Sequence, residues 1–136
     1  MEGEMSRHRL FDPEGLAPAR GLSYGALPAE GRLLHLAGIT GHHEDGTIDE
    51  EIADQVAVAC RSVGRVIAEA GGEPSDVVSI TIYTSDIEEY RENLGPIGEA
   101  YRSVFGRHYP PMALIGIDEL MDPEAKVELV CVAVVP

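Results

Sequence analysis

The chain has 136 residues, 44% of them hydrophobic, and its formal net charge is −14 at pH 7. This length suits one domain, and the apolar fraction is enough for a hydrophobic core. Ten Lys and Arg residues face 24 Asp and Glu residues, so neither nucleic acid nor an anionic membrane is expected as a partner. Without a signal peptide or an apolar run near the roughly 20 residues that cross a bilayer, a cytoplasmic protein is predicted.

The N-terminal part of the chain differs in composition from the rest. Residues 1–20 contain prolines, glycines and mixed charges, which predicts an extended arm whose start, Met1–Arg9, is frayed, and residues 21–136 are predicted to form a single domain. Within this domain, Ser23–Leu27 is typical of a short edge strand that ends in a proline and glycine turn. Arg32–Ala37 is predicted to be the next strand, which Gly38 ends.

The middle of the chain predicts a long helix followed by a buried strand. Residues 49–70 carry apolar side chains at spacings of three and four, which indicates an amphipathic helix. Thr47 or Asp49 can cap its start, and Gly71-Gly72 can end it. The nearly continuous β-branched run Val77–Thr84 then predicts a well-buried strand.

A second helical region is predicted from Ile87 to Phe105. Gly95-Pro96 interrupts it, because proline fits a first helical turn but not a helix interior. Two further strands, Met112–Ile117 and Ala125–Val135, follow. Strands separated by helices of this length predict a mixed sheet with both helices packed on one face. The other face would leave apolar strand residues in water, so self-association through that face is expected.

Several short segments, in order and at matching spacing, resemble the RidA/YjgF family, whose members were formerly described as endoribonuclease L-PSP proteins. The resemblance runs from Leu22 to Val135. It implies an α+β fold of the chorismate-mutase type, a homotrimer, and a pocket between adjacent subunits. The segments that carry the resemblance are 31–38, Gln55, 68–72, 76–78, Asp86, 101–105, Tyr109-Pro110 and Val127-Glu128-Leu129.

The resemblance also implies a chemistry. In the imine-deaminating members, an arginine pairs with the substrate carboxylate, and a strand glutamate helps to place a water molecule that hydrolyses 2-imino or enamine acids to 2-oxo acids and ammonia. The matching glutamate here is Glu128. A guanidinium can hold a carboxylate through two hydrogen bonds, and a carboxyl group beside the imine carbon can transfer protons. No cofactor and no metal is expected, because an imine is already electrophilic.

This sequence departs from the family pattern at its most informative position. The motif arginine aligns with Met112, which carries no charge and makes the pocket more apolar. Gly98 and Ile39 stand where the family has asparagine and glutamine, and Ser23-Tyr24 reverses a Tyr-Ser pair. The chain is therefore identified as a divergent member, for which simple 2-imino acids are predicted to be poor substrates. Arg107 or a basic residue of a neighbouring subunit could supply the missing charge.

Two functional hypotheses follow. In the first, a divergent enzyme hydrolyses or deaminates an imine, an enamine or a related reactive small molecule, with Glu128 as its acid or base. In the alternative, a non-catalytic trimer binds a small metabolite. The resemblance gives the same substrate-binding or ligand-binding candidates in both cases, namely Met112, Ala113, Leu114, Tyr24, Ser23, His35 and Gly38.

Other reactive side chains favour structural interpretations. Adjacent histidines such as His42-His43 rarely point at one metal ion, so an exposed polar turn is favoured. Cys60 and Cys131 lie among apolar neighbours and are predicted to be buried free thiols. Tyr90 and Tyr101 belong to the apolar stripe of the second helical region and are predicted to lie in the core. His35, inside a strand, is expected to be partly buried and hydrogen-bonded.

Overall fold

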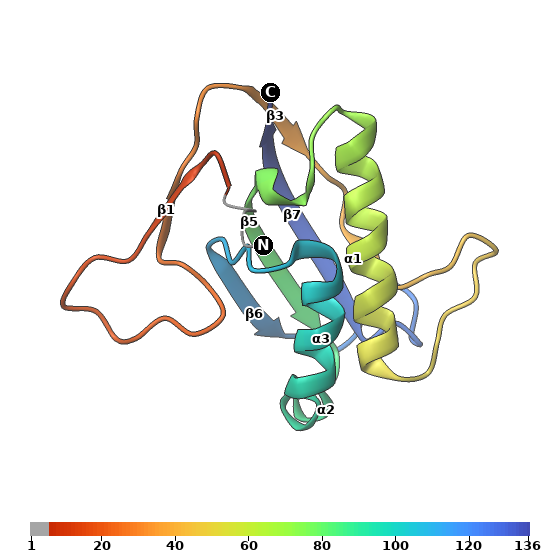
Figure 1. The fold of residues 1–136 in the computed structure, drawn as a ribbon. Coiled ribbons are helices and arrows are strands. Elements are labelled where there is room, and N and C mark those ends of the chain that lie inside the picture. The colour runs from red at the N-terminus through yellow and green to blue at the C-terminus, as the bar shows by residue number, and fades with distance from the viewer. Residues whose placement is uncertain (1–5) are drawn as a thin grey trace.

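The computed structural model describes residues 6–136, which form a mixed β-sheet with helices on one of its faces (Figure 1). The strands of this sheet are β3 (Arg32–His35), β4 (Ile39–Thr40), β5 (Val77–Thr84), β6 (Met112–Gly116) and β7 (Val127–Val135). Their order is β3-β7-β5-β6, and β4 also pairs with β7. β7 is antiparallel to its neighbours, whereas β5 and β6 are parallel because a helical crossover connects them.

Within the described residues, three α-helices and one short 3-10 helix accompany the sheet. They are α1 (Ile52–Glu69), η1 (Pro74–Asp76), α2 (Ile87–Glu92) and α3 (Leu94–Phe105). Helix α1 packs against α3 and against β7. Its buried side chains recur at helical spacing and include Ile52, Val56, Ala59, Val63 and Ile67. The predicted α+β class is confirmed, and no helix of residues 6–136 is long and apolar enough to cross a bilayer.

The predicted start of the long helix is wrong by a few residues. Helix α1 begins at Ile52, and its N-cap residue Glu51 makes no capping hydrogen bond through its side chain. The hydroxyl of Thr47 donates instead to the carboxylate of Asp45, 2.7 Å away, so this threonine stabilises the preceding turn. The predicted end is confirmed, because Gly71 follows the helix with φ of 89°, a conformation that favours glycine.

The second helical region is divided into two helices, and the division explains the position of proline. Helix α2 ends at Glu92 and α3 begins at Leu94, so Pro96 lies in the first turn of α3, where a missing N–H costs nothing. Asp86 caps α2 by accepting a hydrogen bond from the backbone N–H of Glu89 at 3.0 Å. The two-helix prediction therefore becomes a three-helix fold.

The N-terminal region forms a strand that the sequence did not predict. Strand β1 (Arg9–Phe11) pairs with β2 (Gly25–Leu27) in a separate two-stranded antiparallel sheet. The segment Ser23–Leu27, predicted to be an edge strand, thus pairs with the arm and not with the main sheet. The part of the predicted arm that comprises residues 1–5 lies outside the described residues.

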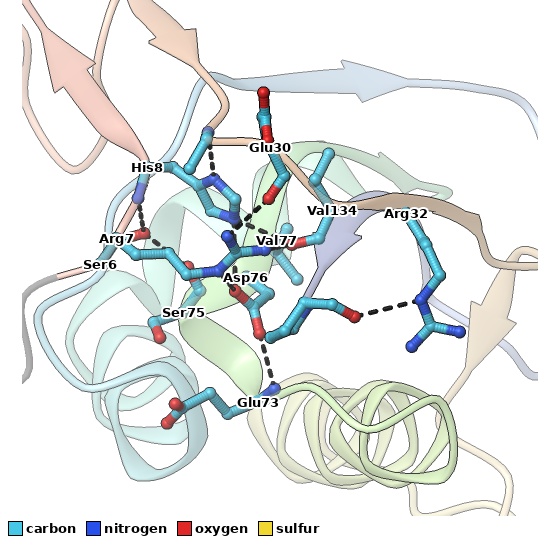
Figure 2. A network of polar contacts seen from close by, with 12 residues as sticks. Ser6, Arg7, His8, Glu30, Arg32, Glu73, Ser75, Asp76, Val77 and Val134 are labelled. Carbon is cyan, nitrogen blue, oxygen red and sulfur yellow. Dashed lines mark hydrogen bonds and ion pairs between the residues drawn. The ribbon is translucent and has the colours of Figure 1, made fainter.

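A polar network attaches the arm to the sheet (Figure 2). The Arg7 guanidinium donates to Asp76 through Nε at 3.1 Å and to the carbonyl of Val134 through Nη2 at 2.9 Å. The Nδ1 atom of His8 accepts from the N–H of Ala29 at 3.0 Å, so Nε2 carries the ring proton and lies 2.9 Å from the Val134 carbonyl. The prediction of a frayed arm is therefore wrong for residues 6–9.

The two cysteines and two of the tyrosines lie where the sequence predicted. Cys60 and Cys131 are free and buried, and burial raises the pKa of each thiol to about 12. Because a thiol with such a pKa stays protonated near neutral pH, neither cysteine is an activated nucleophile. Tyr90 and Tyr101 are also buried in the core.

Candidate functional site

The register of the sheet determines which candidate residues share a face. Met112 pairs with Ile80, and Leu114 pairs with Ile82. Because Ile80 and Ile82 are buried against the helices and paired residues point to the same side, Met112 and Leu114 face the helices. Glu128 of β7 pairs with Tyr83 of β5. Because successive residues of a strand point to opposite faces, Tyr83 and Glu128 point away from the face on which Ile82 is buried. The predicted acid and these two lining residues therefore lie on opposite sides of the sheet.

An apolar cavity of about 320 Å³ lies on the helix side, between β5, β6, α2, α3 and the loop at residues 20–22. This volume is at the lower end of the range for ligand pockets, which suits a small molecule. The lining residues are Arg20, Gly21, Leu22, Val56, Cys60, Ile80, Ile82, Tyr90, Leu94, Ile97, Gly98, Tyr101, Arg102, Tyr109, Met112, Leu114 and Leu129.

Ser23 supports one wall of this cavity and does not line it. Its hydroxyl donates to the carbonyl of Tyr109 at 2.7 Å, and its N–H donates to the carbonyl of Pro110 at 3.4 Å. These bonds attach the loop at residues 20–22 to the segment before β6. Tyr24, the other candidate in this region, is exposed and donates its hydroxyl to the carbonyl of Ala17 at 2.8 Å.

Three ionisable groups of the cavity wall have raised pKa values and stay neutral near pH 7. Burial raises the pKa of Cys60 and of Tyr90 to about 12, and it raises the pKa of Tyr101 further above its usual range. The charged groups of the wall are the guanidinium groups of Arg20 and Arg102. Cys60, Tyr90 and Tyr101 therefore stay protonated at neutral pH and give the cavity no base.

The opposite face of the sheet carries the remaining candidates. The Glu128 carboxylate lies directly against Gly38, where an added Cβ would collide with Oε2 and lie 2.8 Å from Cδ. His35 pairs with Val132 and is exposed, so the prediction of a partly buried His35 is wrong. The helices do not cover this face (Figure 1), and side chains on it such as Val130 and Val132 are partly buried. Ala113 lies on the face opposite Met112 and Leu114.

The two adjacent histidines tie loops together. His42 lies 2.6 Å from the Thr40 hydroxyl through Nδ1 and 2.7 Å from Asp122 through Nε2. His43 points elsewhere, to Asp49 at 2.8 Å. Among residues 6–136, no three His, Cys, Asp or Glu side chains gather in a group that could hold a metal ion. These side-chain contacts therefore attach the loop to neighbouring segments of the chain.

The fold and the cavity place this chain among small α+β proteins that have a pocket beside the sheet. The sequence profile of the family described as Endoribonuclease L-PSP matches residues 15–135. The chain belongs to this family, which is the RidA/YjgF family that its sequence resembles. Membership supports a function related to small molecules in general.

Individual relatives agree with this assignment. A RutC family protein of Aquifex aeolicus is 29% identical over 103 residues, which are 73% of this chain and 79% of that protein. The structure of YyfB of the Rid family from Yersinia pestis has a TM-score of 0.79 at 26% identity, covering 94% and 98% of the two chains. Escherichia coli TdcF, solved with bound serine, has a TM-score of 0.68 at 21% identity, covering 92% and 94%, and shows the fold alone.

Sequence reasoning missed the charged part of the cavity wall. It considered Arg107 as a substitute for the motif arginine, but Arg107 does not line the cavity, whereas Arg20 and Arg102 do. A signal for Arg102 was present, because Gly98 lies one helical turn before it and leaves space on the same face of the helix. Arg20 had no comparable signal, since it lies in an irregular segment.

Proposed function

We propose that this protein is a cofactor-independent enzyme that hydrolyses or deaminates an imine, an enamine or a related reactive small molecule, with Glu128 as its acid and base. The observation that carries this proposal is the state of Glu128. Its carboxylate forms no hydrogen bond and no ion pair with any other residue from 6 to 136, and it lies over the bare backbone of Gly38. A partly buried carboxylate without a structural partner, on a face that can receive a ligand, is available for proton transfer.

The chemistry balances without a cofactor. Glu128 accepts a proton from a water molecule as the water oxygen attacks the electrophilic imine carbon, and the carboxyl group passes this proton to the imine nitrogen, which gives a carbinolamine. The carboxylate then takes the proton of the carbinolamine hydroxyl and delivers it to the nitrogen, so that the carbon–nitrogen bond breaks, ammonia leaves and the carbonyl forms. One water molecule is consumed, and no electrons are transferred.

The site needs a second copy of the chain, because Glu128 and the cavity lie on opposite faces of one sheet. We infer a homotrimer in which Met112 and Leu114 of one subunit face Glu128, Gly38 and His35 of the next. The exposed apolar side chains of the sheet support self-association, since Leu33 and Ile115 are 63% and 42% exposed and such side chains favour burial at an interface.

The substrates follow from the cavity wall. Met112 replaces the family's arginine, so short, simple 2-imino acids are expected to be poor substrates, and molecules with a larger apolar body are expected to be better ones. RNA is not expected as a substrate, because a chain with a net charge of −14 repels phosphate groups. An enzyme acting on such soluble metabolites is expected in the cytoplasm.

The test generates 2-imino acids from several amino acids with an amino-acid oxidase and follows their trapping by semicarbazide. Catalytic amounts of the protein should slow the trapping of imines from leucine or phenylalanine more than that of the imine from alanine. The variant Glu128→Gln should lose this activity, and Glu119→Gln, which removes an exposed carboxylate of a loop, should keep it. Sizing measurements on each variant show whether the assembly is intact.

One observation favours the alternative, a small-metabolite-binding trimer without turnover. Cys60, Tyr90 and Tyr101 of the cavity wall stay protonated near neutral pH because burial raises the pKa of each, so the proposed chemistry depends on Glu128 of a neighbouring copy. A folded trimer that binds a ligand but accelerates no imine hydrolysis, either as wild type or as Glu128→Gln, would support the binding protein and contradict the enzyme.

A further inference from the structure

A hydrogen-bonded row of three polar side chains ends beside Glu128. Nε2 of His42 lies 2.7 Å from the carboxylate of Asp122, and Nδ1 of the same ring lies 2.6 Å from the Thr40 hydroxyl. Thr40 and Glu128 are partners in the pairing of β4 with β7, so their side chains point to the same side of the sheet, with Cβ atoms about 5 Å apart. The row therefore leads from the loop that contains Asp122 to the site of the proposed reaction.

The charge of Asp122 determines the direction of both hydrogen bonds. The backbone N–H of Glu124 donates to Oδ1 of Asp122 at 3.0 Å, and this bond, followed by the bond from His42, lowers the pKa of Asp122. Because an ionised carboxylate only accepts hydrogen bonds, Nε2 of His42 carries a proton. In the neutral ring Nδ1 is then an acceptor, and the Thr40 hydroxyl donates to it.

This direction determines what Thr40 offers to a ligand. A hydroxyl group has one proton and two lone pairs. Because His42 takes the proton in a hydrogen bond, the Thr40 oxygen presents only lone pairs to the face that it shares with Glu128. The Glu128 carboxylate is also an acceptor, and it lies against Gly38, two residues before Thr40. Two acceptors at one position favour a ligand group that donates N–H bonds over a carbonyl oxygen, which only accepts them.

We propose that Asp122 and His42 are positioning residues that hold the Thr40 hydroxyl as an acceptor beside Glu128, and that Thr40 binds an N–H group of the ligand. An imine, an enamine and a carbinolamine carry such a group, whereas the carbonyl product does not. Thr40 therefore holds the nitrogen end of the substrate until the carbon–nitrogen bond breaks, and its loss of a partner then favours release of the product. This inference gives a specificity-determining residue to the site proposed above and rests on that proposal for the identity of the ligand.

The binding experiment compares two probes by calorimetric titration. Phenylacetamidine is stable to hydrolysis and carries N–H donors on a planar carbon, as an imine does, and phenylacetone has a ketone oxygen and a methyl group in their place. In Thr40→Val the affinity for the amidine should fall at least roughly tenfold, as expected for the loss of a hydrogen bond to a charged group, while the affinity for the ketone should not change. Valine matches threonine in shape and favours strands, so this variant should remain folded.

Matched variants separate this role from a structural one. Thr40→Ser keeps the hydroxyl and should restore the wild-type affinity for the amidine, and Thr47→Val, which removes an exposed hydroxyl bonded to Asp45, should leave it unchanged. His42→Ala frees the Thr40 hydroxyl to rotate, so the preference for the amidine over the ketone should fall about threefold. The control His43→Ala removes the neighbouring imidazole, which bonds to Asp49 at 2.8 Å, and should keep the wild-type preference.

Nitrogen NMR of the imidazole rings reports the proton positions directly. A neutral His42 ring with its proton on Nε2 gives two widely separated resonances, and a doubly protonated ring gives two similar ones. A protonated Nδ1 of His42 at neutral pH, no binding of the amidine by the wild type, or unchanged binding in Thr40→Val would each overturn the inference. Amidine binding that depends on Thr40, without imine hydrolysis, would contradict only the proposed enzyme. Imine hydrolysis with the same kcat/KM in Thr40→Val as in the wild type would contradict only the role of Thr40.

Discussion

Replacing Gln55 by leucine should destabilise the protein substantially, although the two side chains are similar in size. Gln55 is fully buried in α1. Its Nε2 atom donates to the carbonyl groups of Asp49 at 2.8 Å and of Glu124 at 3.1 Å, and its Oε1 atom accepts from the N–H of Lys126 at 2.8 Å. One side chain therefore fixes the segment before α1 and the start of β7, two positions before Glu128.

The expected loss can be worked out from these three bonds. Each contributes about 1 kcal/mol net, so Gln55→Leu should lower the free energy of unfolding by about 3 kcal/mol. With a urea dependence of about 2 kcal/mol per molar, the unfolding midpoint should fall by about 1.5 M.

Urea unfolding followed by circular dichroism measures this change. The control Glu69→Leu, at the exposed end of α1, should change the free energy of unfolding by less than about 0.5 kcal/mol. If the midpoint of Gln55→Leu fell by less than about 0.5 M with an unchanged slope, water would be replacing the lost bonds, and the reasoning would be refuted.

Three further predictions concern the site, pH and the thiols. Gly38→Ala should displace the flexible end of Glu128, so imine hydrolysis should fall roughly a hundredfold while the circular dichroism spectrum stays unchanged. Burial lowers the pKa of His108. The neutral form of His108 therefore stabilises the fold at pH values above the unfolded pKa of about 6.5, and this stability is lost as the pH falls below that value. The urea midpoints of wild type and His108→Gln should converge between about pH 7 and pH 5. Cys60 and Cys131, with their raised pKa values, should react with a thiol reagent only after unfolding.

Each of these predictions has an outcome that contradicts it. Full activity in Gly38→Ala would show that the position of the Glu128 carboxylate against Gly38 is not needed. A constant difference between wild type and His108→Gln across this pH range would show that the buried imidazole does not resist protonation. Rapid modification of the native thiols would show that the core opens readily.

The sequence predicted best those elements whose own residues determine them. The strand Val77–Thr84 was located correctly because a β-branched run favours extended backbone whatever its partner is. The end of α1 was located because glycine signals a left-handed residue after a helix. Strand β1 was missed because it has three residues, too few for a periodic pattern, and exists only through its pairing with β2.

The site was predicted less well because its parts depend on faces and on distant contacts. The identity of Met112 and Glu128 came from the resemblance, but which side of the sheet each occupies depends on the pairing of β6 and β7. The guanidinium of Arg102 was missed because a surface arginine on a helix has no pattern that distinguishes a ligand contact from solvation.

The centre of the sheet is also the last part of the fold to be synthesised, which bears on how the protein folds in the cell. β7 pairs with β3, β4 and β5, so the complete sheet cannot form before residues 127–135 leave the ribosome. Arg7 binds a carbonyl 127 residues further along the chain, and at about 5–20 residues per second translation adds roughly 6–25 s between them. In the later part of this interval, after β5 has been made and before β7 follows, the nascent chain exposes the unpaired edge of β5, and chaperones that recognise apolar strands are expected to bind it there.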